Sequence, residues 1–346
     1  MKNQWRLLVL FPVVFVVVSC TASGVVQPGD LVIDSLMYEK TSDVVVIPRK
    51  GSVTISAVDD SYWDSIVSES TGAMWRGVFI KDRTVTLGPY AMAKYPVTQE
   101  LFTAVMGFNP SHFRKENLNG MHDSVGTAEN PNLRPVDTVS WFDAVVFCNL
   151  LTLRMMRESD CVYYTNSRCS RIYTREDADK GIVPFYDMRK RGYRLPTEAE
   201  WEFAARGGNT SASDWYGAYS GTRSENGRMV HDAQHYSFVD TNLDAYGWYR
   251  GNSNGMTHEV GTKLPNALGL YDMSGGVWEW LYDVYDNEVH TGTFKNPSGA
   301  PTGPSRVLRG GSWYDPAFEC SVIRRFHNGH PYIPHFYFGF RYCRSL

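Results

Sequence analysis

After Gly208 the sequence carries almost no signals for helix formation, and this constrains the fold more than any other feature. Short aromatic segments alternate there with Gly, Asn, Asp and Pro, a pattern typical of irregular loops and short strands. We therefore expect an α+β fold in which a compact scaffold holds long loops. Long ordered loops on such a scaffold usually carry function.

Regular elements are predicted mainly before Gly208. Three helices should begin at capping residues, because Thr98, Ser140 and Thr197 each precede an apolar run, and Thr197 forms a T-x-x-E capping box with Glu200. Glycines at 207–208 should end the third helix. Runs rich in β-branched residues predict strands at 44–48, 52–58 and 83–87.

The composition indicates one loop-rich globular domain. Of 346 residues, 43% are hydrophobic and 30 are glycines, and neither an internal repeat nor a linker follows Leu36. A formal net charge of -3 argues against nucleic acid as a partner. We expect a monomer of one domain, residues 44–346.

The N-terminus has the features of an export signal. Lys2 and Arg6 precede an apolar run at 7–18, which is too short to span a membrane comfortably. The run ends in Ser19 and Cys20, and residues 17–20 resemble a bacterial lipobox, after which Cys20 would be lipidated. The alternative is an ordinary signal peptide with a chance cysteine. We expect a lipoprotein signal at 1–20, a tether at 21–43, and membrane anchoring in the cell envelope, with possible surface exposure.

Five further cysteines leave the redox state open. An odd number in an exported chain leaves at least one thiol unpaired, or all of them free. The absence of a C-x-x-C pair makes a zinc ribbon improbable. These cysteines are Cys148, Cys161, Cys169, Cys320 and Cys343.

The segment 314–338 has an unusual composition. It contains three of the nine histidines and seven aromatic residues, but no Lys, Met, Gln or Trp. Large aromatic side chains mixed with small polar ones make up binding paratopes. A loop-rich edge of the core would have a similar composition, so both interpretations stay open at this point.

Seven sequence blocks resemble the formylglycine-generating (sulfatase-modifying factor) family, in order and in spacing. The resemblance covers roughly residues 44–346 and implies a C-type-lectin-like α+β fold with little regular secondary structure. The blocks are YPVT (95–98), RPVDTVSW (134–141), YRLPTEAEWE (193–202), NALGLYDM (266–273), WEW (278–280), RGGSW (309–313) and GFR (339–341).

The resemblance argues against catalysis. In the formylglycine generators two cysteines five residues apart hold copper; Cys320 matches the second, whereas Asp315 occupies the first position. A linear copper(I) site needs two soft thiolates, so no copper is expected. Other enzymes of this fold use iron held by histidines, but the pair His231 and His235 has metal-binding spacing only if its segment is helical. Solvated loop histidines are the simpler interpretation.

The resemblance also implies a structural calcium site. Asp272 and Glu279 match side-chain ligands of the family, and Gly275 and Val277 match carbonyl donors. Hard oxygen ligands from one short loop suit calcium. The alternative is that the two carboxylates cap turns.

Within this fold, the variable proteins of diversity-generating retroelements resemble the chain more closely. Their rewritten C-terminal window is largely restricted to codons ending in C, which excludes Lys, Gln, Glu, Met and Trp; only Glu319 breaks this rule between 314 and 338. Trp313, Cys320, Val322, Arg325 and Pro331 would be constant scaffold, and Ile323 and Phe340 are expected to point inward. The resemblance implies ligand-binding positions at Tyr314, Asp315, Phe318, Ser321, Ile323, Phe326, His327, Asn328, His330, Tyr332, Ile333, His335, Phe336, Tyr337 and Phe338.

The sequence thus favours a lipid-anchored, non-enzymatic protein whose variable C-terminal face binds a protein or a surface polymer. An oxygen-dependent, sulfatase-modifying type of enzyme is one alternative. A structural envelope lipoprotein without a specific ligand is the other.

Overall fold

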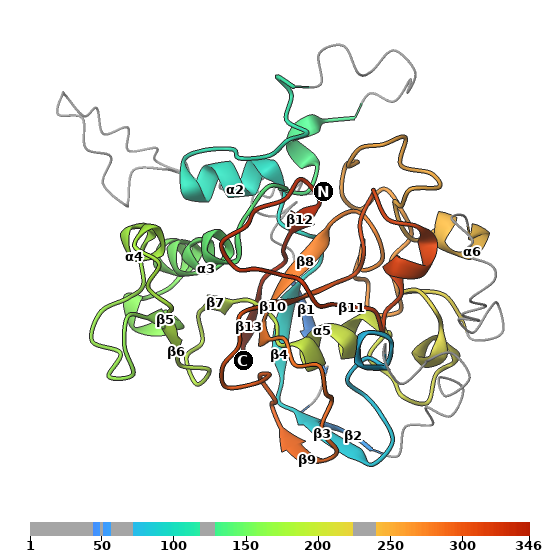
Figure 1. Cartoon of the computed structure of the whole chain (residues 1–346), viewed down its shortest axis with the longest axis horizontal. Helices are drawn as coiled ribbons and strands as arrows, with labels where there is room; N and C mark the ends of the chain where they lie inside the picture. Colours follow the sequence, from blue (N-terminus) through green and yellow to red (C-terminus); the bar gives the residue numbers. More distant parts are fainter. Residues whose placement is uncertain (1–43, 49–50, 57–71, 118–128, 224–239) are drawn as a thin grey trace, which may run out of the picture. The chain divides into compact units, whose positions relative to one another are not determined.

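The three longest described helices begin at the predicted capping residues (Figure 1). In the computed structural model, which describes residues 44–48, 51–56, 72–117, 129–223 and 240–346, the side chains of Thr98, Ser140 and Thr197 each accept a hydrogen bond from a backbone N–H three residues on. The described helices are α2 (Gln99–Met106), α3 (Trp141–Met155), α4 (Arg175–Asp179), α5 (Glu198–Ala205) and α6 (Thr241–Asp244).

Single 3-10 turns connect several of these elements. Residues 207 and 208, just beyond α5, have φ values of 79° and 71°, which glycine adopts without steric cost. The predicted end of the third helix is therefore confirmed. The turns are η2 (Gly72–Trp75), η3 (Pro131–Leu133), η4 (Glu158–Asp160), η5 (Ser213–Tyr216) and η7 (Ala317–Cys320).

Short strands form four small sheets, in the orders β1-β4-β13-β7, β11-β10-β8-β12, β2-β3-β9 and β5-β6. The expected α+β fold with little regular structure is confirmed. The strands are β1 (Val44–Ile47), β2 (Val53–Ile55), β3 (Arg83–Leu87), β4 (Tyr90–Ala93), β5 (Tyr163–Tyr164), β6 (Phe185–Tyr186), β7 (Tyr193–Arg194), β8 (Trp278–Val284), β9 (Gly292–Lys295), β10 (Arg306–Arg309), β11 (Arg325–Phe326), β12 (Phe338–Gly339) and β13 (Cys343–Ser345).

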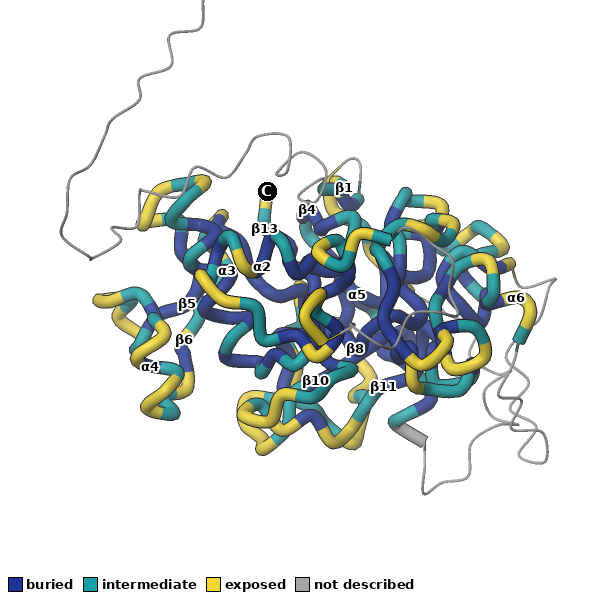
Figure 2. The backbone as a smooth tube through the Cα atoms, turned by 90° about the horizontal axis from the view of Figure 1, so that it is seen from above, coloured by how far each residue is buried: buried dark blue, intermediate teal, exposed yellow. Residues whose placement is uncertain are grey.

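Strand β8 is the longest of the strands that were not predicted from the sequence. All seven of its residues are buried, so its sequence shows no alternation of apolar and polar positions (Figure 2). It pairs with β10 on one side in antiparallel fashion and with β12 on the other in parallel. The strand therefore runs under the C-terminal segment and positions it.

Buried ion pairs join α5 to the strands. Every residue of α5 is buried, including Glu198, Glu200 and Glu202. Arg194 contacts Glu200 at 2.7 Å, and Arg309 contacts both Glu198 and Glu202 at 2.7 Å. Buried charges are tolerated when they are paired and hydrogen-bonded, as these are.

Candidate ligand-binding surface

The segment 314–338 begins at a glycine pair that lets two backbones touch. A Cβ atom at Gly311 would lie 2.6 Å from both Cα and Sγ of Cys320, and Gly311 has a φ of 72°. Only glycine fits this close approach at a positive φ. The start of the segment is thereby fixed against the turn η7.

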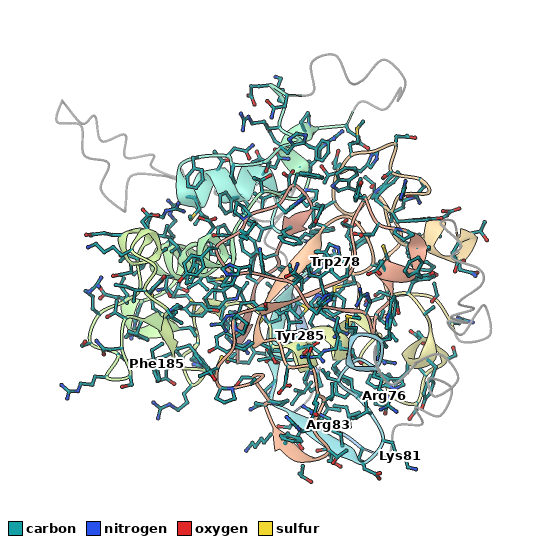
Figure 3. The ribbon with its side chains drawn as sticks, in the orientation of Figure 1. Arg76, Lys81, Arg83, Phe185, Trp278 and Tyr285 are labelled. Carbon is teal, nitrogen blue, oxygen red and sulfur yellow. The ribbon has the colours of Figure 1, made fainter. Side chains whose placement is uncertain are left out.

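Buried arginines hold the middle of the segment. Arg309 donates to the carbonyl oxygen of Val322 at 2.6 Å, and Arg325 contacts Glu198 at 2.7 Å. The end of the segment is held by β12, whose Phe338 pairs with Trp278 of β8, which Figure 3 labels. The backbone of 314–338 is therefore attached to the core at several points, and the side chains between these points can vary.

Twelve of the fifteen predicted positions are solvent-accessible. The exposed fraction reaches 51% at Tyr314, 46% at Tyr332 and 55% at Ile333. His327, Asn328 and His330 are also exposed. The remaining six are half-buried: Asp315, Phe318, Phe326, His335, Phe336 and Tyr337.

The other three predicted positions lie in the interior, which corrects their assignment to the surface. Ser321 and Ile323 are 0% exposed and Phe338 is 4% exposed. The Ser321 hydroxyl accepts from the Ile323 N–H, and the Phe338 ring packs at 5.1 Å from that of Trp280. A segment with anchors every few residues must turn some side chains inward. For Ile323 and Phe340, this inward orientation was expected and is confirmed.

The largest group of accessible rings forms around Tyr314. Its ring lies 6.2 Å from that of Tyr337 in stacked orientation, and Tyr337 stacks on His335 at 3.7 Å. The ring of Phe336 packs 5.6 Å from His112, a residue that sequence reasoning missed. His112 belongs to a loop without periodicity, so no pattern marked it.

A second group surrounds Tyr332. Its ring lies 4.6 Å from that of Phe142 of α3, and its hydroxyl donates to the Gly181 carbonyl at 3.2 Å. His330 lies 5.7 Å from the same ring. A third group joins Phe326, His327 and Tyr285, with the last two rings 6.4 Å apart. The predicted positions thus occupy three neighbourhoods rather than one continuous pocket.

Asp315 follows Tyr314 in the chain and is hydrogen-bonded to two scaffold residues. Its Oδ2 atom accepts from the Trp278 indole N–H at 2.8 Å and from the Ser312 hydroxyl. Burial raises the pKa of Asp315 to about 6, although these two hydrogen bonds oppose the shift. Asp315 therefore acts as a structural hydrogen-bond acceptor.

The pKa of Asp315 predicts a pH dependence of stability. The pKa of Asp315 is about 6 in the folded state and lower in the unfolded state, so between these two values the folded state binds more protons. Protonation of Asp315 therefore stabilises the fold fully in acid, and this stabilisation is lost as the pH rises through about 6. Asp315→Asn removes the titrating carboxyl group and with it the cost of a buried negative charge. At pH 7.5 the variant should therefore be about 1 kcal/mol more stable than wild type. Urea unfolding of both proteins at pH 5 and 7.5 tests it. Identical pH dependence of the two would contradict the assignment.

Cys320 has the environment of a structural thiol. It is 0% exposed, and its Sγ atom lies 3.9 Å from the carbonyl oxygens of Ser312 and Pro316. Burial, with the charges of Asp315 and Glu319, raises the pKa of Cys320 well above its ordinary value. Metal binding and nucleophilic attack both need the thiolate, which this environment disfavours. None of the five described cysteines forms a disulfide.

One of the four predicted calcium ligands, Glu279, is engaged by an arginine. Both carboxylate oxygens of Glu279 bind the Arg341 guanidinium at 2.7 Å, and Oε2 also accepts from the Trp201 indole at 2.7 Å. Asp272 accepts from the Gly261 N–H at 2.8 Å. A carboxylate engaged by an arginine cannot coordinate calcium without leaving that cation unpaired in the core. Calcium binding at Asp272, Gly275, Val277 and Glu279 stays a prediction, and it would compete with the Arg341 contact of Glu279.

Several predictions fall outside the described residues or stay untested. The signal at 1–20 with Cys20, the tether at 21–43, and the pair His231 and His235 all lie outside them. Across the described part of the chain, no helix is both long and apolar enough to cross a membrane. In the same residues, no three His, Cys, Asp or Glu side chains are grouped so that they could hold a metal ion.

Comparison with known proteins supports the resemblance drawn from the sequence. Treponema denticola variable protein 1 is 32% identical with a TM-score of 0.62, covering 85% of this chain and 95% of that one. Chaperone protein LppX of Paenibacillus barcinonensis is 31% identical over 234 residues, 67% of this chain and 72% of the relative. The formylglycine-generating enzyme of Thermomonospora curvata is 36% identical over 137 residues, but the chain spans only 42% of it. Residues 35–346 match the sulfatase-modifying factor enzyme 1-like domain, and the chain belongs to that family.

Proposed function

We propose that the chain is a non-catalytic binding protein that presents the accessible side chains of 314–338 to a protein or a surface polymer. The observation that carries this proposal is the contrast within the segment. Its backbone is held by buried contacts such as those of Arg309 and Arg325, while Tyr314, Tyr332 and Ile333 expose about half of their surface. Exposed aromatic groups on a fixed backbone supply contact area at low entropic cost.

The similarity to a variable protein supports the same interpretation. A binding surface that changes by mutation needs a scaffold that tolerates those changes, and surface substitutions away from buried features usually alter stability by only about 0.5 kcal/mol. The buried ion pairs of Arg309 and Arg325 are made with Glu198 and Glu202, which lie outside 314–338. We also propose that lipidation of Cys20 anchors the protein in the cell envelope, as the lipobox indicates.

The residues at the family's copper site favour binding over catalysis. The first of the two cysteine positions holds Asp315, which Trp278 and Ser312 engage, and the second holds Cys320, whose raised pKa keeps it a thiol. Two thiolates are what copper(I) would need there. Oxygen-dependent conversion of a cysteine-containing sulfatase peptide, abolished by Cys320→Ser, would contradict the non-catalytic proposal.

A display library tests the binding surface directly. Residues at the six exposed positions Tyr314, His327, Asn328, His330, Tyr332 and Ile333 are randomised. Selection against streptavidin, ovalbumin and serum albumin should yield folded binders at least about 100-fold tighter than the parent, or about 2.7 kcal/mol. Their melting temperatures should stay close to that of the parent.

A matched library provides the control. It randomises six exposed positions elsewhere on the described surface: Val46, Phe108, Met155, Val183, Leu264 and Lys295. This second library should give no binders under the same selection. Unfolding of most variants of the first library, or equal yields from both, would overturn the proposal.

A further inference from the structure

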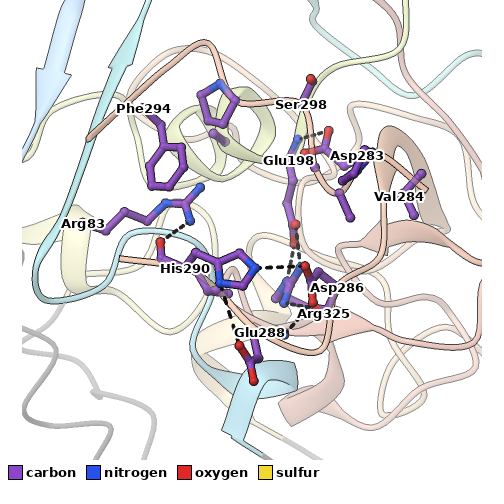
Figure 4. Close-up of a pocket in the computed structure, with 16 residues that line it drawn as sticks. Arg83, Glu198, Asp283, Val284, Asp286, Glu288, His290, Phe294, Ser298 and Arg325 are labelled. Carbon is purple, nitrogen blue, oxygen red and sulfur yellow. Dashed lines mark hydrogen bonds and ion pairs between the residues drawn. The ribbon is translucent and has the colours of Figure 1, made fainter. Parts of the chain in front are cut away.

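A cavity of about 220 Å³ is lined by Arg325 of the segment 314–338 and otherwise by residues of other elements (Figure 4). Arg83 comes from β3, Asp283 from the end of β8 and Phe294 from β9. Its rim is formed by Asp286, Glu288 and His290 of the loop between β8 and β9. None of these six residues belongs to 314–338.

Arg83 places a cation in this cavity without an ion-pair partner. One of its guanidinium nitrogens, Nη1, donates to the His290 carbonyl at 2.7 Å, and the Phe294 ring covers it at 4.4 Å. Its Nε atom is buried without a hydrogen-bond partner, and no carboxylate of the described residues forms an ion pair with Arg83. Burial lowers the pKa of Arg83, because the desolvation cost of the guanidinium exceeds what the charges of Glu198 and Glu202 offset. An anionic ligand group would remove that cost.

Asp283 adds a second polar group to the interior. It is 3% exposed, and its Oδ2 atom accepts from the Glu198 N–H at 2.9 Å. The carboxylate of Glu198 is itself bound by Arg309 and Arg325, so Asp283 gains no cation of its own. Burial raises the pKa of Asp283 well above its usual range, and the charge of Glu198 adds to the shift. When protonated, Asp283 can donate a hydrogen bond to a carboxylate.

The rim carries the opposite charge. Asp286 and Glu288 both lie near the His290 ring, with closest atoms 3.3 Å and 3.8 Å away. The rim backbone is fixed because Arg325 donates from Nη1 to the Asp286 carbonyl at 3.0 Å. A cation in the interior and carboxylates at the rim favour a ligand whose anionic group enters the cavity and whose cationic group stays at the rim. Val284, Val289 and Ala300 line the remaining wall and suit a small apolar group.

We propose that this cavity binds a small zwitterion of the amino-acid type, with its carboxylate at Arg83 and its ammonium at the rim. The volume suits a ligand smaller than the drug-sized molecules that fill pockets of about 300–1,000 Å³. The ligand groups proposed here, Arg83 and the rim carboxylates, lie outside 314–338, whereas Arg325 of that segment lines the wall of the cavity.

Calorimetric titration with four probes tests the class of ligand. L-leucine carries both charges, 4-methylpentanoate lacks the ammonium, L-leucinamide lacks the carboxylate, and inorganic phosphate is an anion alone. L-leucine should bind, and each of the others should bind about 10-fold more weakly or worse, since each loses a charge-assisted contact. Absence of L-leucine binding at roughly 10 mM, or tighter binding of phosphate than of L-leucine, would overturn the proposal.

Variants of the full chain identify the residues. Arg83→Met should weaken L-leucine binding about 10-fold or more, whereas Lys295→Met, which removes an exposed cation from the neighbouring strand, should leave it unchanged. Asp286→Asn with Glu288→Gln should bring the affinities for L-leucine and 4-methylpentanoate together. Because this rim pair is exposed, it tests the proposal even if Arg83→Met lowers the melting temperature. Unchanged L-leucine affinity in both variants would place the ligand elsewhere.

Discussion

Replacing Glu279 by Gln is expected to lower the free energy of unfolding by about 3–5 kcal/mol, because it leaves the Arg341 guanidinium buried without its counter-charge. Glu279 and Arg341 are 0% exposed and three contacts between them are 2.9 Å or shorter. Arg341 also donates to the carbonyls of Ala93 and Tyr271, so it cannot turn towards solvent without breaking these bonds. Urea unfolding at pH 7 measures the loss.

Two further proteins make this measurement specific. Glu116→Gln removes a carboxylate that is 73% exposed and pairs with Arg114 at 3.7 Å, so it should cost less than about 1 kcal/mol. Combining Glu279→Gln with Arg341→Met removes the stranded cation and should recover part of the loss. A loss below about 1 kcal/mol for Glu279→Gln alone would show that the pair is not a structural element.

The same variant also tests the predicted calcium site. If Glu279 serves Arg341, calcium and EDTA should leave the wild-type melting temperature unchanged. If calcium raises the melting temperature of wild type but not that of Glu279→Gln, the predicted calcium site is confirmed, because a ligand of the folded state stabilises it by mass action.

Replacing Phe338 by Ala is expected to cost about 3–5 kcal/mol, since it empties a site that is only 4% exposed in the core. The Phe338 ring packs against Trp280 at 5.1 Å and against Phe326 at 5.8 Å, on the strand that closes over β8. The remaining cavity is bounded by rigid rings and cannot easily collapse. Thermal and urea unfolding of the variant measure the cost.

Tyr332→Ala is the matched control within the same segment. Tyr332 is 46% exposed, and its contacts include rings at 4.6 Å and 5.7 Å and one hydrogen bond, so its loss should cost about 1 kcal/mol. The contrast between the two aromatic residues separates scaffold positions from display positions. Equal costs for the two variants would mean that the whole segment is core, which is the interpretation that composition left open.

If these two results hold, the segment alternates anchors with variable positions. The anchors would then include Ser321, Ile323 and Phe338, all predicted as contact residues. A library that spares them should retain more folded members than one that covers all of 314–338. This consequence bears on the design of any diversified version of the protein.

Local features of the fold could be predicted from the sequence because they depend on neighbours in the chain. The caps at Thr98, Ser140 and Thr197 each involve an N–H three residues away, and β3 was predicted at the residues where it lies. The family could be recognised for a related reason: seven short blocks keep their spacing. The binding segment was marked by its composition.

Burial and partner choice were decided only by the tertiary structure. Glu279 and Arg341 are 62 residues apart, and a carboxylate in the sequence does not reveal whether it faces an arginine, a calcium ion or water. Nor could composition separate Phe338 from Tyr332, because Tyr332 lies in a loop and the strand that holds Phe338 is only two residues long, too short for a periodic pattern to fix the side-chain direction. The cavity at Arg83 draws on residues from 83 to 325. Sequence pattern is a short-range signal, whereas these contacts arise from long-range packing that pairs one buried group with another.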